Sequence, residues 1–260
     1  MSDAPGDAAY AEYLERMLAH EPEMRLARAL VRSQREPCVE ALQVLDTLLL
    51  DAALEVRDTG VALAKLGWWH DELARALAGA GRHPVARRLV QAGVRDADAL
   101  AARVDAAGAI ARLESPPDDA ALLAPFIRYA RASAAADTLA GTAEARGAAY
   151  LTMRVRRWPA FAPPQRARIP LATLARGGFS RDAVACDPVA SAAAIESLAL
   201  ALAGMIGAAT SADDARVVCA RHVLRALRRD PRRAAGGDVR ARPVPLLIAL
   251  WRIARRERSA

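Results

Sequence analysis

Two aspartates stand inside an apolar helix that the sequence predicts, and carboxylates are side chains that can bind Mg²⁺ or carry protons. Asp46 and Asp51 lie in CVEALQVLDTLLLDAALEV, directly after Pro37. Because a buried unpaired charge is costly, each must reach water, an arginine or a metal. Ligands on one helix share a face at a spacing of three or four, whereas five residues turn them about 140° apart. We therefore expect solvent-facing or arginine-paired roles rather than a joint metal site.

A second pair of carboxylates follows two adjacent tryptophans in WWHDEL, residues 68–73. Asp71 and Glu72 are further catalytic candidates. Neighbouring residues of a helix point in different directions, so one of Trp68 and Trp69 is expected in the core and the other in a groove or interface. The chain has no GxSxG, HExxH or phosphate-binding P-loop motif, and its four histidines show no metal-ligand spacing.

An arginine-rich stretch without any acid follows later in the chain. Between Glu144 and Asp182 there are eight arginines and no Asp or Glu. This stretch is an anion site, a solvated basic surface, or an old active site whose acids are gone. In the first case guanidinium–phosphate pairs would hold the anion, and the candidates are Arg154, Arg156, Arg157, Arg166 and Arg168.

The net charge of +7 comes from the C-terminal part of the sequence. From Cys219 to the end there are 12 arginines against three acids. Such a tail suits an anionic membrane surface, a nucleic acid or an acidic protein, and a solvated arginine-rich end is the alternative. Nucleic acid is the least supported partner, because the tail has one aromatic residue and no recognition motif.

Cysteine usage and the N-terminal sequence indicate a cytoplasmic protein. Cys38, Cys186 and Cys219 are too few and too scattered for a disulfide framework or a zinc site. The first 30 residues contain no apolar signal-peptide segment. Peripheral contact with the inner membrane is expected if the basic tail binds lipid.

The elements that must position these residues are all predicted to be helices. Alanine is abundant, and no segment alternates with the period of a strand. We predict nine or ten helices, with starts near Pro37, Asp58, Pro84, Ser211 and Pro243, and one helix over 126–157 with room for a relaxed turn near Gly141 or Gly147. Residues 159–170 and 230–243 are expected to be irregular, and the apolar run 198–209 to be a buried core helix too short to span a bilayer. One domain over 21–235 would carry an N-terminal extension, 1–20, and a basic terminal helix within 236–260.

Three stretches in order resemble the squalene/phytoene-synthase-like family. KLGWWHDELARALAGAGRHPVARRL is similar to the family segment that runs from a WW-plus-acid helix through a Gly turn into His-Pro-Val. GAAYLTMRVRRWPAFAPPQRARIPLATLARGGFS is similar to its second-motif region, and EALQVLDTLLLDAAL stands where the first acidic motif belongs. The resemblance covers most of residues 20–255.

The resemblance implies an isoprenoid-synthase-type helical bundle around a central cavity, with Trp68, Trp69 and Tyr150 in that cavity or in the core. In active members, two Asp-rich motifs hold Mg²⁺ ions, which clamp a prenyl diphosphate for condensation. This chain departs from that pattern, because Arg157 and Phe161 stand where the second motif has aspartates. An arginine at a ligand position repels Mg²⁺. The divergent branch that it resembles is that of the phytoene-synthase-like assembly factor of respiratory complex I.

These observations predict a non-catalytic protein that binds a prenyl or lipid ligand or serves an assembly partner, with no cofactor or metal. The alternative is an active prenyltransferase of isoprenoid biosynthesis, using Mg²⁺ held by atypical ligands. It requires that candidates among Asp46, Asp51, Asp71 and Glu72 converge in space.

Overall fold

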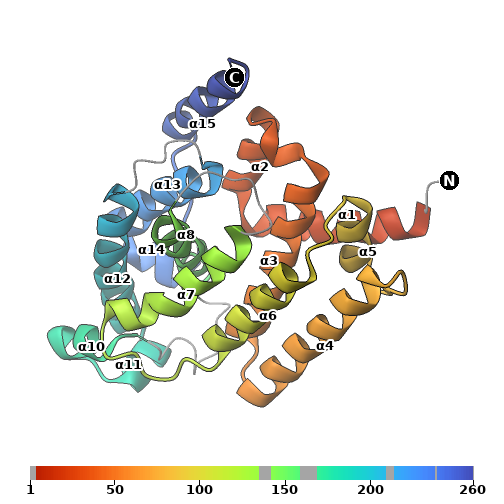
Figure 1. Ribbon diagram of the computed structural model, residues 1–260. Helices are drawn as coiled ribbons and strands as arrows, with labels where there is room; N and C mark the ends of the chain where they lie inside the picture. The colour runs from red at the N-terminus through yellow and green to blue at the C-terminus, as the bar shows by residue number, and fades with distance from the viewer. Residues whose placement is uncertain (1–3, 135–141, 159–168, 209–213, 238, 260) are drawn as a thin grey trace.

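The computed structural model describes residues 4–134, 142–158, 169–208, 214–237 and 239–259. Within these ranges the chain forms fourteen α-helices and one short 3₁₀ helix, with no strand. The helices pack as a single-domain bundle (Figure 1). The all-α prediction is confirmed, while the predicted number of helices was too low.

The first part of the chain forms α1 (Ala4–His20), α2 (Pro22–Leu30), the 3₁₀ helix η1 (Ser33–Arg35), α3 (Pro37–Glu55), α4 (Thr59–Leu77), α5 (Pro84–Gln91) and α6 (Ala97–Ala111). The later part forms α7 (Asp119–Ala134), α8 (Ala143–Val155), α10 (Leu171–Gly177), α11 (Arg181–Cys186), α12 (Pro188–Ala208), α13 (Ala215–Arg229), α14 (Pro231–Ala235) and α15 (Pro243–Glu257).

The helix boundaries follow from capping chemistry. The Asp58 carboxylate accepts a hydrogen bond from the Val61 amide at 2.9 Å and so begins α4. Prolines occupy the first turn of α3, α5 and α15, where a missing N–H costs nothing. After α4 the chain turns through Gly79, whose φ of +82° favours glycine. The starts predicted near Pro37, Asp58, Pro84 and Pro243 are confirmed.

One hydrophobic core runs through the bundle. α3, α4 and α6 pack together on one side, α8, α12 and α13 pack together on the other, and α7 joins them by contacting both α6 and α8 (Figure 1). α1, expected as an extension, packs on α2, α3 and α5. It buries Tyr10, Met17 and Leu18, and it therefore belongs to the packed domain.

The predicted continuous helix over 126–157 is wrong. α7 and α8 are separate and antiparallel: Arg131 near the end of α7 meets Glu144 at the start of α8, and the Tyr129 and Tyr150 rings lie 5.2 Å apart. The missed signal is Thr142, whose hydroxyl accepts from the Ala145 amide and caps α8. The residues between the two helices lie outside the described ranges.

Three further expectations concern the second half of the chain. α14 forms inside the segment that was expected to be irregular. The loop predicted over 159–170 falls mostly outside the described residues, and so does Ser211. α13 begins at Ala215, with Asp214 as its cap. By length and composition, residues 188–206 of α12 could cross a membrane, so the apolar helix is longer than the run 198–209 that was predicted to be too short for a bilayer. Half of this window is buried in the bundle.

Candidate functional site

An open cleft with a volume of ≈ 550 Å³ lies where α1, α3, α4 and the start of α5 meet. Its walls combine aromatic and aliphatic side chains, two carboxylates line its interior, and two exposed basic side chains border it. The lining residues are Tyr13, Arg16, Leu48, Asp51, Ala52, Glu55, Val56, Lys65, Trp68, Trp69 and His83. We call this the α1–α4 cleft.

The aromatic wall of the α1–α4 cleft is centred on His83. Its ring centroid lies 4.6 Å from that of Trp69, 4.9 Å from Tyr13 and 5.8 Å from Trp68. Trp69 is buried, whereas Trp68 is 45% exposed in the cleft, so the predicted division between a core and a groove tryptophan is confirmed. Burial outweighs the charge of Glu72 and lowers the pKa of His83 below its ordinary value. His83 is therefore neutral at neutral pH.

Glu72 fixes the turn that carries His83. Its buried carboxylate accepts from the backbone amides of Arg82 and His83, both within 2.6 Å, and from the Arg75 guanidinium at 2.8 Å. These hydrogen bonds overcome the effect of burial and lower the pKa of Glu72. Asp71, by contrast, has a side chain that is 71% exposed and lies 3.7 Å from His70 Nδ1. Neither candidate lines the cleft.

One arginine bridges the two carboxylates of the cleft. Arg157 places Nη1 2.8 Å from Asp51 Oδ1 and Nη2 2.6 Å from Glu55 Oε1. Arg154 adds a second ion pair to Asp51. Burial and the nearby Asp51 charge raise the pKa of Glu55, against the opposite effect of Arg157. The spacing of four between Asp51 and Glu55 could have identified Glu55 from the sequence, and it was overlooked.

This arrangement does not fit a Mg²⁺ site. Mg²⁺ requires near-octahedral oxygen coordination, and the oxygens of Asp51 and Glu55 that face Arg157 are occupied by its guanidinium. No cluster of three His, Cys, Asp or Glu side chains suited to a metal is found in the part of the chain that the structure describes.

The arginine-rich end of α8 is paired with carboxylates from α2. Arg156 contacts Glu23, and Arg154 lies 3.5 Å from Glu21, which also contacts Arg216 of α13 at 3.3 Å. All five side chains are at most 6% exposed. The anions that neutralise these buried arginines are therefore side chains of the protein itself. Arg166 and Arg168 lie outside the described residues.

Asp46 belongs to the core, away from the cleft. Its carboxylate accepts from Arg103 Nη1 at 2.8 Å, Tyr129 Oη at 2.7 Å and Tyr150 Oη at 2.6 Å. Burial and Asp46 raise the pKa of both tyrosines, so they remain hydrogen-bond donors. The expected arginine-paired role is observed for both Asp46 and Asp51. The four candidate carboxylates do not form one site.

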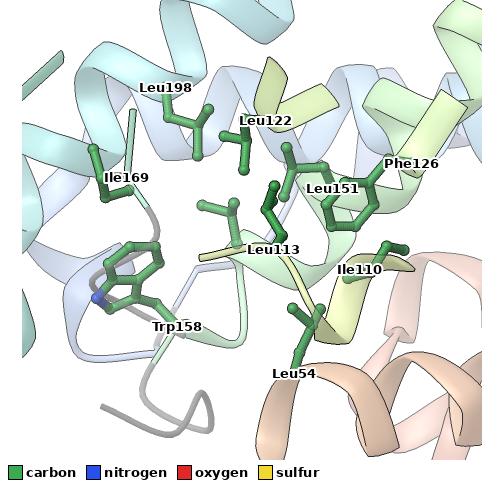
Figure 2. A pocket seen from close by; sticks show the side chains of 10 residues that line it. Leu54, Ile110, Leu113, Leu122, Phe126, Leu151, Trp158, Ile169 and Leu198 are labelled. Atoms are coloured by element: carbon green, nitrogen blue, oxygen red, sulfur yellow. The ribbon is translucent and has the colours of Figure 1, made fainter. Parts of the chain in front are cut away.

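A small apolar pocket lies where the ends of α3, α6 and α8 meet the first half of α7 (Figure 2). Side chains from α3, α6, α7, α8 and α12 converge on it, together with Trp158 and Ile169 from outside these helices. Its volume of ≈ 30 Å³ is room for about two water molecules. As described, this pocket is too small for a prenyl chain, which leaves the α1–α4 cleft as the larger candidate. Residues 159–168, which connect Trp158 to Ile169, are outside the described ranges.

No protein-family model, curated protein or solved structure matches this chain. The resemblance to squalene/phytoene-synthase-like proteins therefore stays a prediction from the sequence.

Proposed function

We propose that this chain is a non-catalytic protein of the squalene/phytoene-synthase type that binds a prenyl diphosphate or a similar anionic amphiphile in the α1–α4 cleft. The observation that carries the proposal is that Asp51 and Glu55, which line a cleft with an aromatic wall, are bridged by Arg157. The bridge replaces a metal-binding pair by an internal ion pair, and the cleft itself is retained.

The lining of the cleft supports an amphiphile with an anionic head. Its volume of ≈ 550 Å³ lies within the range of about 300–1,000 Å³ typical of small-molecule sites. Trp68 and Trp69 offer apolar surface to a hydrocarbon chain. Arg16 and Lys65 are exposed at the cleft, while Asp51 is paired with Arg154 and Arg157, and Glu55 with Arg157. The residual positive charge favours a diphosphate or phosphate group.

The same pairing opposes turnover. Ionisation of an allylic diphosphate needs cations that neutralise the leaving group, and in the resembling family these are Mg²⁺ ions held by aspartates. Here Asp51 is held by Arg154 and Arg157, while Asp46 is held by Arg103 in the core. The active prenyltransferase required these candidates to converge, and no observation favours it.

The test is titration of the purified protein with farnesyl diphosphate in the presence of a chelator, followed by tryptophan fluorescence. Saturable quenching is expected, and Trp68→Phe should remove most of it because Trp68 is the exposed tryptophan of the cleft. Arg16→Glu/Lys65→Glu should weaken binding at least about tenfold, from two lost charge-assisted contacts. The matched control is Arg128→Glu, an exposed arginine on α7 that should bind like the unaltered protein.

Two outcomes would count against the proposal in different ways. Absence of binding in chelator, or equal binding by the Arg16/Lys65 variant, would remove the cleft as the ligand site. Binding that requires Mg²⁺, or release of pyrophosphate when Mg²⁺ is added, would show that the protein is an active synthase.

A further inference from the structure

The terminal helix α15 has two apolar faces, and only one of them is covered. Its inner face packs on α2 and α13 and buries Leu246, Leu250, Ile253 and Ala254. The outer face carries large apolar side chains at the helical spacing i, i+3, i+4, i+7: Val244, Leu247, Ile248 and Trp251, which are 63%, 37%, 49% and 48% exposed. Four of the nine exposed large hydrophobic residues of the described chain thus share one stripe of one helix.

Basic residues flank this stripe. A groove of ≈ 370 Å³ separates the exposed sides of α13 and α15, and its lining contains no carboxylate. The charged and titratable groups in the groove are Arg221, His222, Arg225, Arg252 and Arg256. Among the described residues, no acid forms an ion pair with Arg225 or Arg252. We call the apolar stripe and this groove together the α15 surface.

The single carboxylate of α15 points away from this surface. Glu257 accepts from the backbone amides of Arg32 and Ser33, at 2.8 and 3.4 Å, and so fastens the end of α15 to η1. The negative charge of Glu257 is therefore directed toward the start of η1 and not toward the α15 surface. Trp251 lies beside Arg255, whose guanidinium is 5.7 Å from the indole centroid. An amphipathic ring next to long basic side chains is typical of residues at a membrane–water interface.

We propose that the α15 surface binds the face of an anionic lipid bilayer. The apolar stripe would enter the boundary between headgroups and acyl chains, and the flanking arginines would contact lipid phosphates. A nucleic acid would meet the charges but leave the apolar stripe without a partner. α15 lies at one extremity of the molecule (Figure 1), where a flat surface can reach it. This inference concerns a different site from the α1–α4 cleft and does not depend on it.

The experiment is co-sedimentation of the full chain with vesicles of phosphatidylglycerol and with vesicles of phosphatidylcholine. Binding is expected to phosphatidylglycerol, to weaken with added salt, and to be much lower for phosphatidylcholine. Brominated acyl chains should quench tryptophan emission of the bound protein, and Trp251→Phe should remove that quenching. Absence of binding, or quenching that persists in Trp251→Phe, would overturn the proposal.

Variants separate the contribution of the stripe from that of overall charge. Ile248→Glu should reduce vesicle binding at least about tenfold, since an exposed apolar anchor becomes an acid facing anionic lipid. The matched control is Leu200→Glu, which places the same acid at a similarly exposed leucine of α12. Arg225→Gln/Arg252→Gln should weaken vesicle binding by about fivefold for each arginine. Arg57→Gln, on the α3–α4 connection, should change vesicle binding little. All five positions are exposed in the fold, so circular dichroism should show unchanged helix content.

Two results would redirect the inference. Equal losses in Ile248→Glu and Leu200→Glu would show that net charge alone drives binding. Tight binding to poly-glutamate that depends on Ile248, with none to vesicles, would identify an acidic protein segment as the occupant and would overturn the lipid assignment.

Discussion

Replacing Asp46 by asparagine should destabilise the protein strongly. The carboxylate is 2% exposed and accepts from Arg103, Tyr129 and Tyr150. The amide keeps the shape but removes the charge, so the buried ion pair between Asp46 and Arg103, whose side chain is fully buried, is broken. Breaking a buried ion pair by changing one partner costs about 3–5 kcal/mol, against a total stability of about 5–15 kcal/mol for a typical domain. Urea unfolding followed by far-ultraviolet circular dichroism measures the loss.

A double variant tests the origin of that loss. Asp46→Leu/Arg103→Met removes both charges together and should cost less than Asp46→Asn alone, because a buried ion pair replaced by apolar groups is often nearly neutral. The two tyrosine hydroxyls then lose a partner, which limits the recovery by about 1–3 kcal/mol. A single-variant cost below about 1 kcal/mol, or a double variant less stable than the single, would refute the reasoning.

Three further outcomes follow from the packing and the hydrogen bonds. Gly147→Ala should cost about 1–3 kcal/mol of stability in urea unfolding, because the new Cβ would lie 2.8 Å from the backbone nitrogen of Ile127. Gly204→Ala on α12 places its Cβ with nothing within 4 Å and should instead gain about 0.5–1 kcal/mol. Equal effects of the two substitutions would contradict the close approach of α7 and α8. Stability should fall as pH rises above about 10, because burial and Glu40 or Asp46 raise the pKa values of Tyr10, Tyr129 and Tyr150 in the folded protein. A raised folded pKa contributes stability below the pKa of the unfolded state, and this stability is lost as the tyrosines ionise. Phenolate absorbance should show that the three tyrosines titrate late in the native state. Glu72→Gln should be less stable at neutral pH, and its stability should change less with pH below about 4.5. The lowered pKa of Glu72 contributes stability at pH values above the ordinary glutamate pKa, and this stability is lost as the pH falls. An unchanged dependence of stability on acid would show that Glu72 does not hold the turn.

Local signals were legible in the sequence, and long-range pairings were not. Asp58, Pro84 and Pro243 mark helix starts because a cap or a first-turn proline acts within a few residues. The hairpin of α7 and α8 was missed because absence of proline was taken as continuity, although Thr142 carried a capping signal.

The candidate site was only partly predictable for the same reason. The division of roles between Trp68 and Trp69 follows from helix geometry, and the spacing of Asp51 and Glu55 was available to a closer reading. The partner of Arg156, however, is Glu23, which lies 133 residues earlier. No pattern in the sequence of either segment predicts this ion pair, because only tertiary packing brings α2 against α8 and α13.

The pairing of α2 with later helices also sets an order of events during synthesis. Glu21 leaves the ribosome long before Arg216, its partner 195 residues further along the chain. Until α8 and α13 are made, burying Glu21 and Glu23 would leave two carboxylates without counter-ions. α2 can therefore dock stably only once most of the chain has been translated. Until then the apolar face of α2, which includes Met24 and Ala27, stays uncovered by α13 and α15, while the other N-terminal helices can already pack on one another.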